Sequence, residues 1–404
     1  MWSAVGVALA FLMIIVLVTR KVSLGYALLI GSVIVSLSSG NNPWEFLQMA
    51  GSSLVAPATL NLVSTLVLIS MLGSLMKKLG LLDQMVDALQ KVLRNAKLTI
   101  MVIPSIMGTL LVTGGAIMAA PMVNSLGDRL NLSSERRAAI NLLFRHGWYF
   151  IFPFAPTFIL IKEITGIALG RLIAVQFPMA VVAVVAGYFA YLRDVKDDQA
   201  EPGKPTSADY LQLLKYTAPI SIPLVLALGF GLQFQLALLG GLTTALYFGQ
   251  AKPAEIPNLL LKGVQIPILL SGIGIMIFKD ALSQGDTMTA LTSMMLNWGL
   301  PLQLIVVLLP LMIGLTSGSN TSAIGVSMPL LLPALQQSEH TVVLMAGVYC
   351  ASFLGYFLSP LHLCQVLTLE FFKVKINDLY RTYVIPLGAM WATLIAILVV
   401  GTLL

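Results

Sequence analysis

The sequence predicts an all-α polytopic membrane protein built from two inverted repeats. Of its 404 residues, 58% are hydrophobic and only 10% are charged, whereas a soluble domain carries about 25% charged residues. Apolar runs recur along the whole chain, which leaves no separate soluble domain. Two of these runs contain polar interruptions, one near Gly114 and one near Gly318, at matching places in the two halves. Short, Gly-broken segments in corresponding positions indicate the binding site of a repeat-built transporter.

Runs of about 20 apolar residues, the length that crosses a hydrocarbon core, predict ten transmembrane helices. They cover 3–19, 22–38, 57–76, 138–161, 167–192, 211–232, 234–249, 258–278, 341–369 and 384–403. No basic region precedes the first run and no cleavage pattern follows it, so we expect a retained first span.

The apolar regions 98–130 and 299–337 are each split by small polar residues, at Thr113, Gly114 and Gly115 in the first and from Thr316 to Ser322 in the second. A bilayer tolerates irregular polar backbone only where it is buried in protein or lines a cavity. We therefore predict two re-entrant hairpins. Each follows a mixed polar and apolar stretch, 81–93 and 287–298, which favours a helix along the membrane interface.

Basic residues set the predicted orientation. Residues 77–137 contain eight Lys and Arg residues, whereas residues 280–372 contain none. The positive-inside tendency places the first hairpin on the cytoplasmic side, the second on the outer side, and both termini outside. The repeats are then 1–192 and 211–404, joined by a cytoplasmic linker at 193–210. Setting Gly114 against Gly318 and Pro156 against Pro360 gives a common offset of 204 residues.

The second interruption carries the predicted ion site. In a re-entrant hairpin the first limb ends in unpaired carbonyls and the second begins with unpaired amides, which attract a cation and an anion respectively. The stretch from Ser317 through Gly318, Ser319 and Asn320 to Thr321 adds hydroxyl and amide oxygens suited to an alkali cation and a substrate. The alternative is that these small residues only allow close helix packing.

Proline motifs follow both hairpins. Pro156 and Thr157 come after the first, and Ser359 and Pro360 after the second. A proline removes an amide and frees a carbonyl, so either span break exposes backbone groups able to bind substrate. A simple kink is the alternative for each.

Three ionisable residues lie in predicted spans, where such groups are costly and usually functional. Arg145 either pairs with an anionic substrate or extends to the cytoplasmic surface. His146 and His362 either relay protons or are satisfied core histidines. Cys350 and Cys364 lie roughly 21 Å apart along one predicted helix, too far for a disulfide, and the sequence has no CxxC or HExxH metal motif.

The stretch 319–333, with its Ser319-Asn320-Thr321 tip, a proline-broken span after each hairpin and the two inverted repeats, resembles the ion transporter superfamily. Within that superfamily it resembles the divalent anion:sodium symporters and, most closely in length and style, the domain-of-unknown-function 401 family. The resemblance implies a homodimeric elevator transporter with a scaffold and a transport domain. It also implies that Asn320 and Thr321 contact substrate and that backbone near Ser319 and Ser359 holds sodium.

The first hairpin departs from the symporter pattern, because Thr113, Gly114, Gly115 and Ala116 stand where those proteins have a second Ser-Asn-Thr. Coupling to a proton gradient and transport of an anion other than a dicarboxylate therefore remain alternatives.

We expect a secondary active transporter of a small organic anion, a carboxylate, coupled to sodium or protons, in the cytoplasmic membrane of a prokaryote. The alternatives are an ion channel, which would need a continuous polar pore, and a non-transporting membrane assembly protein. An enzyme is not expected, because the spans hold no carboxylate pair, zinc motif or Ser-His arrangement. The expected partners are the anion, the lipid bilayer and a second copy of the chain, with sodium as the only bound ion. No organic cofactor and no nucleic acid is expected, because the Lys and Arg residues behind the charge of +6 cluster in loops.

Overall fold

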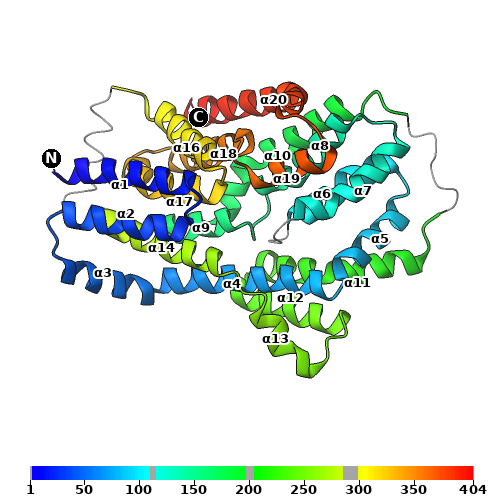
Figure 1. The fold of residues 1–404 in the computed structure, drawn as a ribbon, viewed down its shortest axis with the longest axis horizontal. Coiled ribbons are helices and arrows are strands. Elements are labelled where there is room, and N and C mark those ends of the chain that lie inside the picture. The colour runs from blue at the N-terminus through cyan, green and yellow to red at the C-terminus, as the bar shows by residue number, and fades with distance from the viewer. Residues whose placement is uncertain (1, 110–114, 197–203, 285–298, 404) are drawn as a thin grey trace.

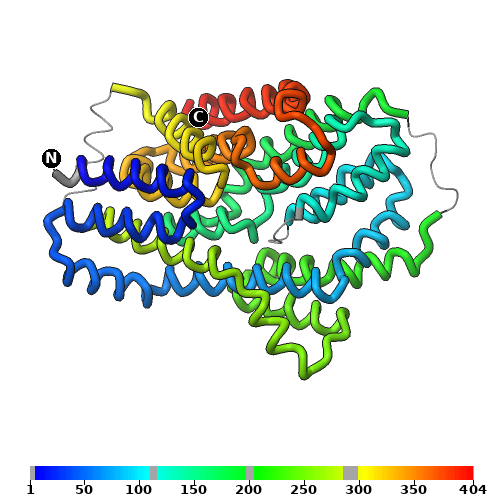
Figure 2. Tube along the Cα trace, in the orientation of Figure 1, coloured from blue at the N-terminus to red at the C-terminus, as the bar shows by residue number. Residues whose placement is uncertain are grey.

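A computed structural model describes residues 2–109, 115–196, 204–284 and 299–403, and these residues are almost entirely helical (Figures 1 and 2). The first half contains α1 (Trp2–Thr19), α2 (Leu24–Ser38), α3 (Pro43–Val55), α4 (Pro57–Lys78), α5 (Leu81–Leu93), α6 (Ala96–Gly108), α7 (Gly115–Arg129), α8 (Ser134–Gly147), α9 (Pro156–Thr165) and α10 (Leu169–Tyr191).

The second half contains α11 (Ser207–Leu224), α12 (Phe234–Phe248), α13 (Ile256–Leu261), α14 (Ile266–Leu282), α16 (Leu302–Ser317), α17 (Asn320–Gln336), α18 (Thr341–Leu358), α19 (Leu363–Phe372) and α20 (Ile376–Leu403). The two halves are interleaved: α14 packs on α2, and α12 on α4. Figure 2 accordingly shows the blue N-terminal helices beside yellow-green segments of the second half.

Helix contacts divide the molecule into two groups. The helices α1–α4 and α11–α14 pack on one another and form the first helix group, while α6–α10 and α16–α20 form the second helix group. Figure 1 shows α3, α4, α11 and α12 along one side and α10, α16, α18 and α20 along the other. The groups meet at a seam where α16 touches α1, α17 touches α14, and α9 touches α4 and α14.

Contacts in one half have counterparts in the other. The pairs α1–α2, α2–α14, α6–α8, α7–α19 and α8–α20 match α11–α12, α12–α4, α16–α18, α17–α9 and α18–α10. Helices α19 and α20 start at residues 363 and 376, each 207 residues after the starts of α9 and α10 at 156 and 169. These helix starts are therefore offset by 207 residues and not by the 204 that separate Pro156 from Pro360; at an offset of 207 the position that corresponds to Pro360 is Pro153.

Both predicted span breaks are present. α8 ends at Gly147 and α9 begins at Pro156, while α18 ends at Leu358 and α19 begins at Leu363. The region 299–337 likewise divides into α16 and α17 at Gly318, which has a left-handed φ of +62°. In the first predicted hairpin, α6 and α7 pack on each other, whereas Thr113 and Gly114 lie outside the described residues. The stretch 81–93 is helical, as α5, and its place along the membrane interface stays a prediction. The second such stretch, 287–298, also lies outside the described residues.

Within the described part of the chain, five helices are long and apolar enough to cross a membrane, or six if the pair 253–261 and 266–282, bent by 49°, forms one span. The predicted span 258–278 therefore contains a break between residues 261 and 266. The predicted spans 22–38 and 234–249 are helices of 15 residues, about 22 Å long at 1.5 Å per residue and short of a core of about 30 Å. The chain is an integral membrane protein. The part that the structure describes does not contain ten full-length spans.

Candidate functional site

The junction of α16 and α17 is held by local hydrogen bonds. Gly318 adopts the left-handed conformation that ends α16, and the Ser319 hydroxyl accepts a hydrogen bond of 3.2 Å from the Ser322 amide, which caps α17. The Ser317 hydroxyl accepts one of 3.3 Å from the Ser319 amide. These bonds satisfy some of the backbone groups that a helix end leaves unpaired.

This junction packs directly on the break between α18 and α19. A β-carbon at Gly318 would lie 2.6 Å from the Leu361 carbonyl carbon, so only glycine fits. Ser359 is fully buried, donates a hydrogen bond of 2.6 Å to the Leu315 carbonyl at the end of α16, and accepts one of 3.1 Å from the Leu361 amide. Ser359 therefore lies against the end of α16, next to the α16–α17 junction.

The break between α8 and α9 is completed by a side chain from the other half. The Tyr349 hydroxyl of α18 donates a hydrogen bond of 2.5 Å to the Tyr149 carbonyl and lies 3.1 Å from the Thr157 hydroxyl. A carbonyl freed by a helix break in a membrane needs such a partner, because lipid offers none. The Tyr380 hydroxyl does the same for the Leu358 carbonyl at the second break, over 2.6 Å.

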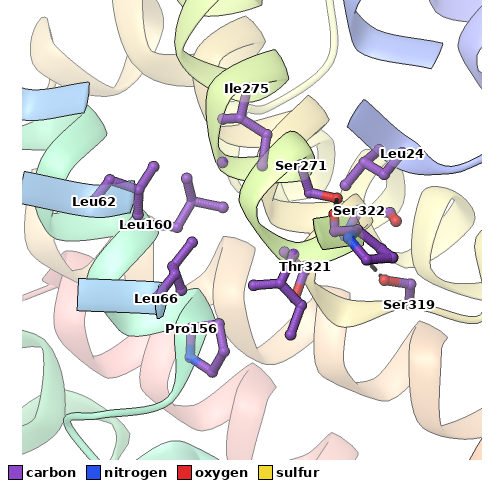
Figure 3. Close-up of a pocket in the computed structure, with 13 residues that line it drawn as sticks. Leu24, Leu62, Leu66, Pro156, Leu160, Ser271, Ile275, Ser319, Thr321 and Ser322 are labelled. Atoms are coloured by element: carbon purple, nitrogen blue, oxygen red, sulfur yellow. Dashed lines mark hydrogen bonds between the residues drawn. The ribbon is translucent and has the colours of Figure 1, made fainter. Parts of the chain in front are cut away.

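A cavity of about 220 Å³ lies at the seam, between the α17 end of this junction and the start of α9 (Figure 3). Its polar lining consists of the hydroxyls of Ser271, Ser319, Thr321 and Ser322. The rest of the lining comes from both helix groups: Leu24, Leu62, Leu66, Pro156, Leu160, Pro267, Ile268, Gly272 and Ile275. Figure 3 shows Thr321 and Pro156 reaching the same space from the two halves of the chain.

Four helices begin at this cavity. Its lining includes the first residues of α2 and α9, Leu24 and Pro156, and first-turn residues of α14 and α17. The amino end of a helix carries a partial positive charge and unpaired amides, so it favours an anion. Among the residues that the structure describes, no Lys or Arg lines the cavity. Helix ends and hydroxyls therefore supply its polarity, beside an apolar wall.

Asn320 points away from the cavity. Its side chain is 5% exposed, and its Oδ1 accepts a hydrogen bond of 2.8 Å from the Ser352 hydroxyl on α18. Its Nδ2 is buried without a partner among the described residues. The tip therefore places Ser319, Thr321 and Ser322 at the cavity and Asn320 against α18.

Arg145 and His146, at the end of α8, lie apart from the cavity. Arg145 is 3% exposed, its Nε and Nη1 have no hydrogen-bond partner, and no acidic group pairs with it within the described residues. The His146 Nδ1 donates to the Leu142 carbonyl over 2.7 Å, and its Nε2 lies 3.0 Å from the Tyr356 hydroxyl. The rings of His146 and His362 approach edge to face with centroids 4.9 Å apart.

A family model, "Protein of unknown function (DUF401)", matches residues 3–402. The chain belongs to this family. No curated protein matches the sequence. Among solved structures, the crystal structure of the Alcanivorax borkumensis YdaH transporter is similar, with a TM-score of 0.56 and 15% identity over 82% of this chain and 84% of that one. At that identity the likeness shows a common fold.

Other residues of the predicted site are dispersed in this DUF401 protein. Gly115 is the first residue of α7. Pro360 is exposed and does not line the cavity, whereas Pro156 does. Cys350 is buried, Cys364 is half-buried, and neither forms a disulfide.

Sequence reasoning missed a polar link between the first hairpin region and the second break. The buried Asn141 of α8 donates from Nδ2 to the Ala116 carbonyl of α7 over 3.1 Å and to the Thr368 hydroxyl of α19 over 3.0 Å. Gln365, also buried, lies 3.3 Å from the Ser359 carbonyl. The available signal was a lone Asn, Gln or Thr within an apolar span, but nothing in the sequence shows which of them meet.

Proposed function

We propose that this DUF401 protein is a secondary active transporter of a small organic anion, a carboxylate, and that the anion binds in the seam cavity. The convergence of four helix amino ends on one cavity carries the proposal. The anionic group would lie against the starts of α9, α14 and α17, where the partial positive charge of the helix ends favours it and the Thr321 and Ser322 hydroxyls can donate. Its apolar part would lie along Leu62, Leu66 and Ile275. The small volume fits a small molecule.

A second cavity at the seam supports alternating access. It measures about 430 Å³ and lies where α5, α6 and residues 148–153 face α11. In the two-repeat scheme, the first cavity belongs to the second hairpin and this one to the first hairpin. Movement of the second helix group against the first would open one cavity as the other closes. The matching helix contacts support the two-repeat scheme, as do the offsets between helix starts, which are 206 residues from α6 to α16 and 207 from α9 to α19.

The remaining roles follow from this scheme as proposals. Sodium would be held at the junction formed by Ser317, Gly318, Ser319 and Ser359, with Asn320 positioned behind it. Thr113 and Gly114 would form the opposite tip. Arg145 lies apart from the seam cavity, so it would pair with the anion at a later stage of transport, within the second helix group. The working unit would be a homodimer in the cytoplasmic membrane of a prokaryote, with both termini outside.

The test is the thermal stability of the detergent-purified protein against a panel of small carboxylates and inorganic anions, each in sodium and in potassium at equal ionic strength. A ligand at 100 times its dissociation constant stabilises the folded state by about 2.7 kcal/mol. We expect a shift that needs one carboxylate, and Thr321→Val should remove it. A sodium requirement would identify the coupling ion, whereas a shift that rises at lower pH and ignores sodium would identify protons. No shift across the panel would overturn the anion proposal.

A further inference from the structure

Three metal-ligand side chains from the two halves of the chain meet inside the second helix group. His146 ends α8, His362 immediately precedes α19, and Cys364 lies in the first turn of α19. One ligand atom from each lies within 4.8 Å of the other two. Metal bonds of about 2.0 to 2.3 Å place ligand atoms roughly 3.5 to 4 Å apart. The three side chains therefore need to close by only about 1 Å.

The imidazole of His362 is buried in this cluster without a full set of hydrogen-bond partners. Its side chain is 2% exposed, and one ring nitrogen has a weak interaction with the Phe357 carbonyl. No hydrogen bond of good geometry reaches either nitrogen within the described part of the chain, so at least one of them has no partner. A buried polar group without a partner costs free energy. A ligand bound through a ring nitrogen would remove this cost.

His146 is already oriented as a metal ligand. Its Nδ1 must carry the proton, because its partner at 2.7 Å is the Leu142 carbonyl, which only accepts. A histidine ligand usually donates its second N–H to a backbone carbonyl in this way, which fixes the ring and leaves the other nitrogen for the metal. Here Nε2 accepts the hydrogen bond from the Tyr356 hydroxyl at 3.0 Å, and a metal would displace it.

The positive charge of Arg145 favours a monovalent metal ion over a divalent one. Arg145 interacts electrostatically with both imidazoles and has no acidic partner among the described residues. A divalent ion bound by one thiolate would add a second positive charge beside it, and uncompensated buried charge is costly. A monovalent ion and a thiolate cancel. Thiolate and imidazole ligands suit Cu(I).

We infer that His146, His362 and Cys364 form a binding site for one monovalent soft metal ion, Cu(I) or Ag(I). On binding, the Cys364 thiol releases its proton to solvent and its sulfur forms the metal bond. Both histidines bind as neutral imidazoles, and the metal keeps its oxidation state. The site joins the two span breaks, which come from opposite halves of the chain.

The first test measures Cu(I) binding to the full-length protein in detergent, by competition with a chromophoric Cu(I) chelator under reducing conditions. We expect one Cu(I) per chain, and at least tenfold weaker binding in His362→Ala and in Cys364→Ala. His340→Ala and Cys350→Ala are matched controls, because they change the third histidine and the second cysteine; both should bind as the unaltered protein does. Equal losses in the controls, or full binding by His362→Ala, would overturn the site.

The second test leaves all three ligands intact and does not depend on how the His362→Ala and Cys364→Ala variants fold. In the Cys350→Ala protein, Ag(I) should protect Cys364 from alkylation by a maleimide, with an end point at one Ag(I) per chain. Unchanged alkylation at that ratio would overturn the site. Zn(II) in place of Ag(I) should protect at least tenfold less well at equal concentration, and equal protection would refute the preference for a monovalent ion. Neither assay requires transport or an organic anion, so its result is separate from that of the proposed function.

Discussion

The Ser352 hydroxyl of α18 lies 2.8 Å from the Asn320 carboxamide oxygen at the start of α17 and 2.8 Å from the Tyr349 carbonyl of its own helix. Its single hydrogen is therefore shared between the hairpin tip and the broken span. If Asn320 is removed, Ser352 keeps an acceptor, so the bond that joins the two elements can be tested without leaving a buried hydroxyl unpaired.

Asn320→Ala should abolish substrate uptake in proteoliposomes while lowering the free energy of unfolding by only about 1 kcal/mol, the value of one hydrogen bond. The control is Ser327→Ala on the same helix, where the hydroxyl bonds only the Ala323 carbonyl; its uptake should stay near normal. Undiminished uptake by Asn320→Ala would remove Asn320 from the site.

Gly318→Ala should destabilise the protein more than Gly166→Ala, by a further 1 to 3 kcal/mol or so. Both glycines have positive φ, +62° and +71°, so both substitutions carry the left-handed strain, but a β-carbon at 166 meets open space. Thermal unfolding of the two variants isolates the contact with Leu361. Equal melting temperatures would show that the contact yields easily.

Arg145→Met should leave the free energy of unfolding unchanged or raise it by up to about 3 kcal/mol, because it removes a buried charge that has no acidic partner in the described structure. Arg137→Met should lower it by about 1 kcal/mol, since Arg137 bonds Asp128, Asn124 and the Leu132 carbonyl, with Asp128 partly screened by solvent. Melting curves without ligand compare the two. If Arg145 binds the anion, Arg145→Met should also reduce the carboxylate-dependent shift.

The ion pair between Arg136 and Asp194 should persist into acid. Hydrogen bonds of 3.1 and 3.0 Å from Arg136 lower the pKa of Asp194 below its ordinary value. A carboxylate with a lowered folded-state pKa contributes stability above its unfolded pKa of roughly 3.9 and loses it as the pH falls through the folded value. The stability difference between the unaltered protein and Asp194→Asn should therefore be constant from about pH 5 to 8 and shrink below about pH 4. A difference that grows below pH 4 would contradict this sign.

Cysteines introduced at Thr321 and at Ser221, one in each seam cavity, should report alternating access. With the native cysteines replaced by alanine, a carboxylate that stabilises the protein should change their alkylation rates in opposite directions. Ser327→Cys, buried in α17, should stay unreactive throughout. Parallel changes at both cavities would contradict alternating access.

Residues with a strong local effect made much of the fold predictable. Pro156, Pro360 and Gly318 interrupt helices because of their own backbone chemistry, so both span breaks and the α16–α17 junction lie where the sequence places them. The missed helix α3 was also marked locally: Asn42 and Glu45 form a capping box and Pro43 is the first helical residue. No helix is predicted for residues 43–55, because they lie between two long apolar runs.

Long-range contacts were not predictable in the same way. Ser319, Thr321 and Pro156 were each predicted as site residues, but nothing local shows that they share a cavity with Ser271, or that Asn320 faces α18. Asn141 and Thr368 are 227 residues apart, and their hydrogen bond depends on how α7, α8 and α19 pack. The full burial of Arg145 likewise follows from its neighbours, because an Arg near a helix end can also extend to the membrane surface.

The helix pairs α6–α8 and α16–α18 can pack closely because each contains a glycine at the contact. A β-carbon at Gly108 of α6 would collide with the Arg145 carbonyl of α8, and one at Gly314 of α16 would lie 2.6 Å from the Ser352 carbonyl of α18. During synthesis, each glycine leaves the ribosome before the carbonyl that its surface is shaped to meet. Helices α6 and α16 are therefore made before their packing partners α8 and α18, and we expect the packing of each to be completed only after the following broken span has been inserted.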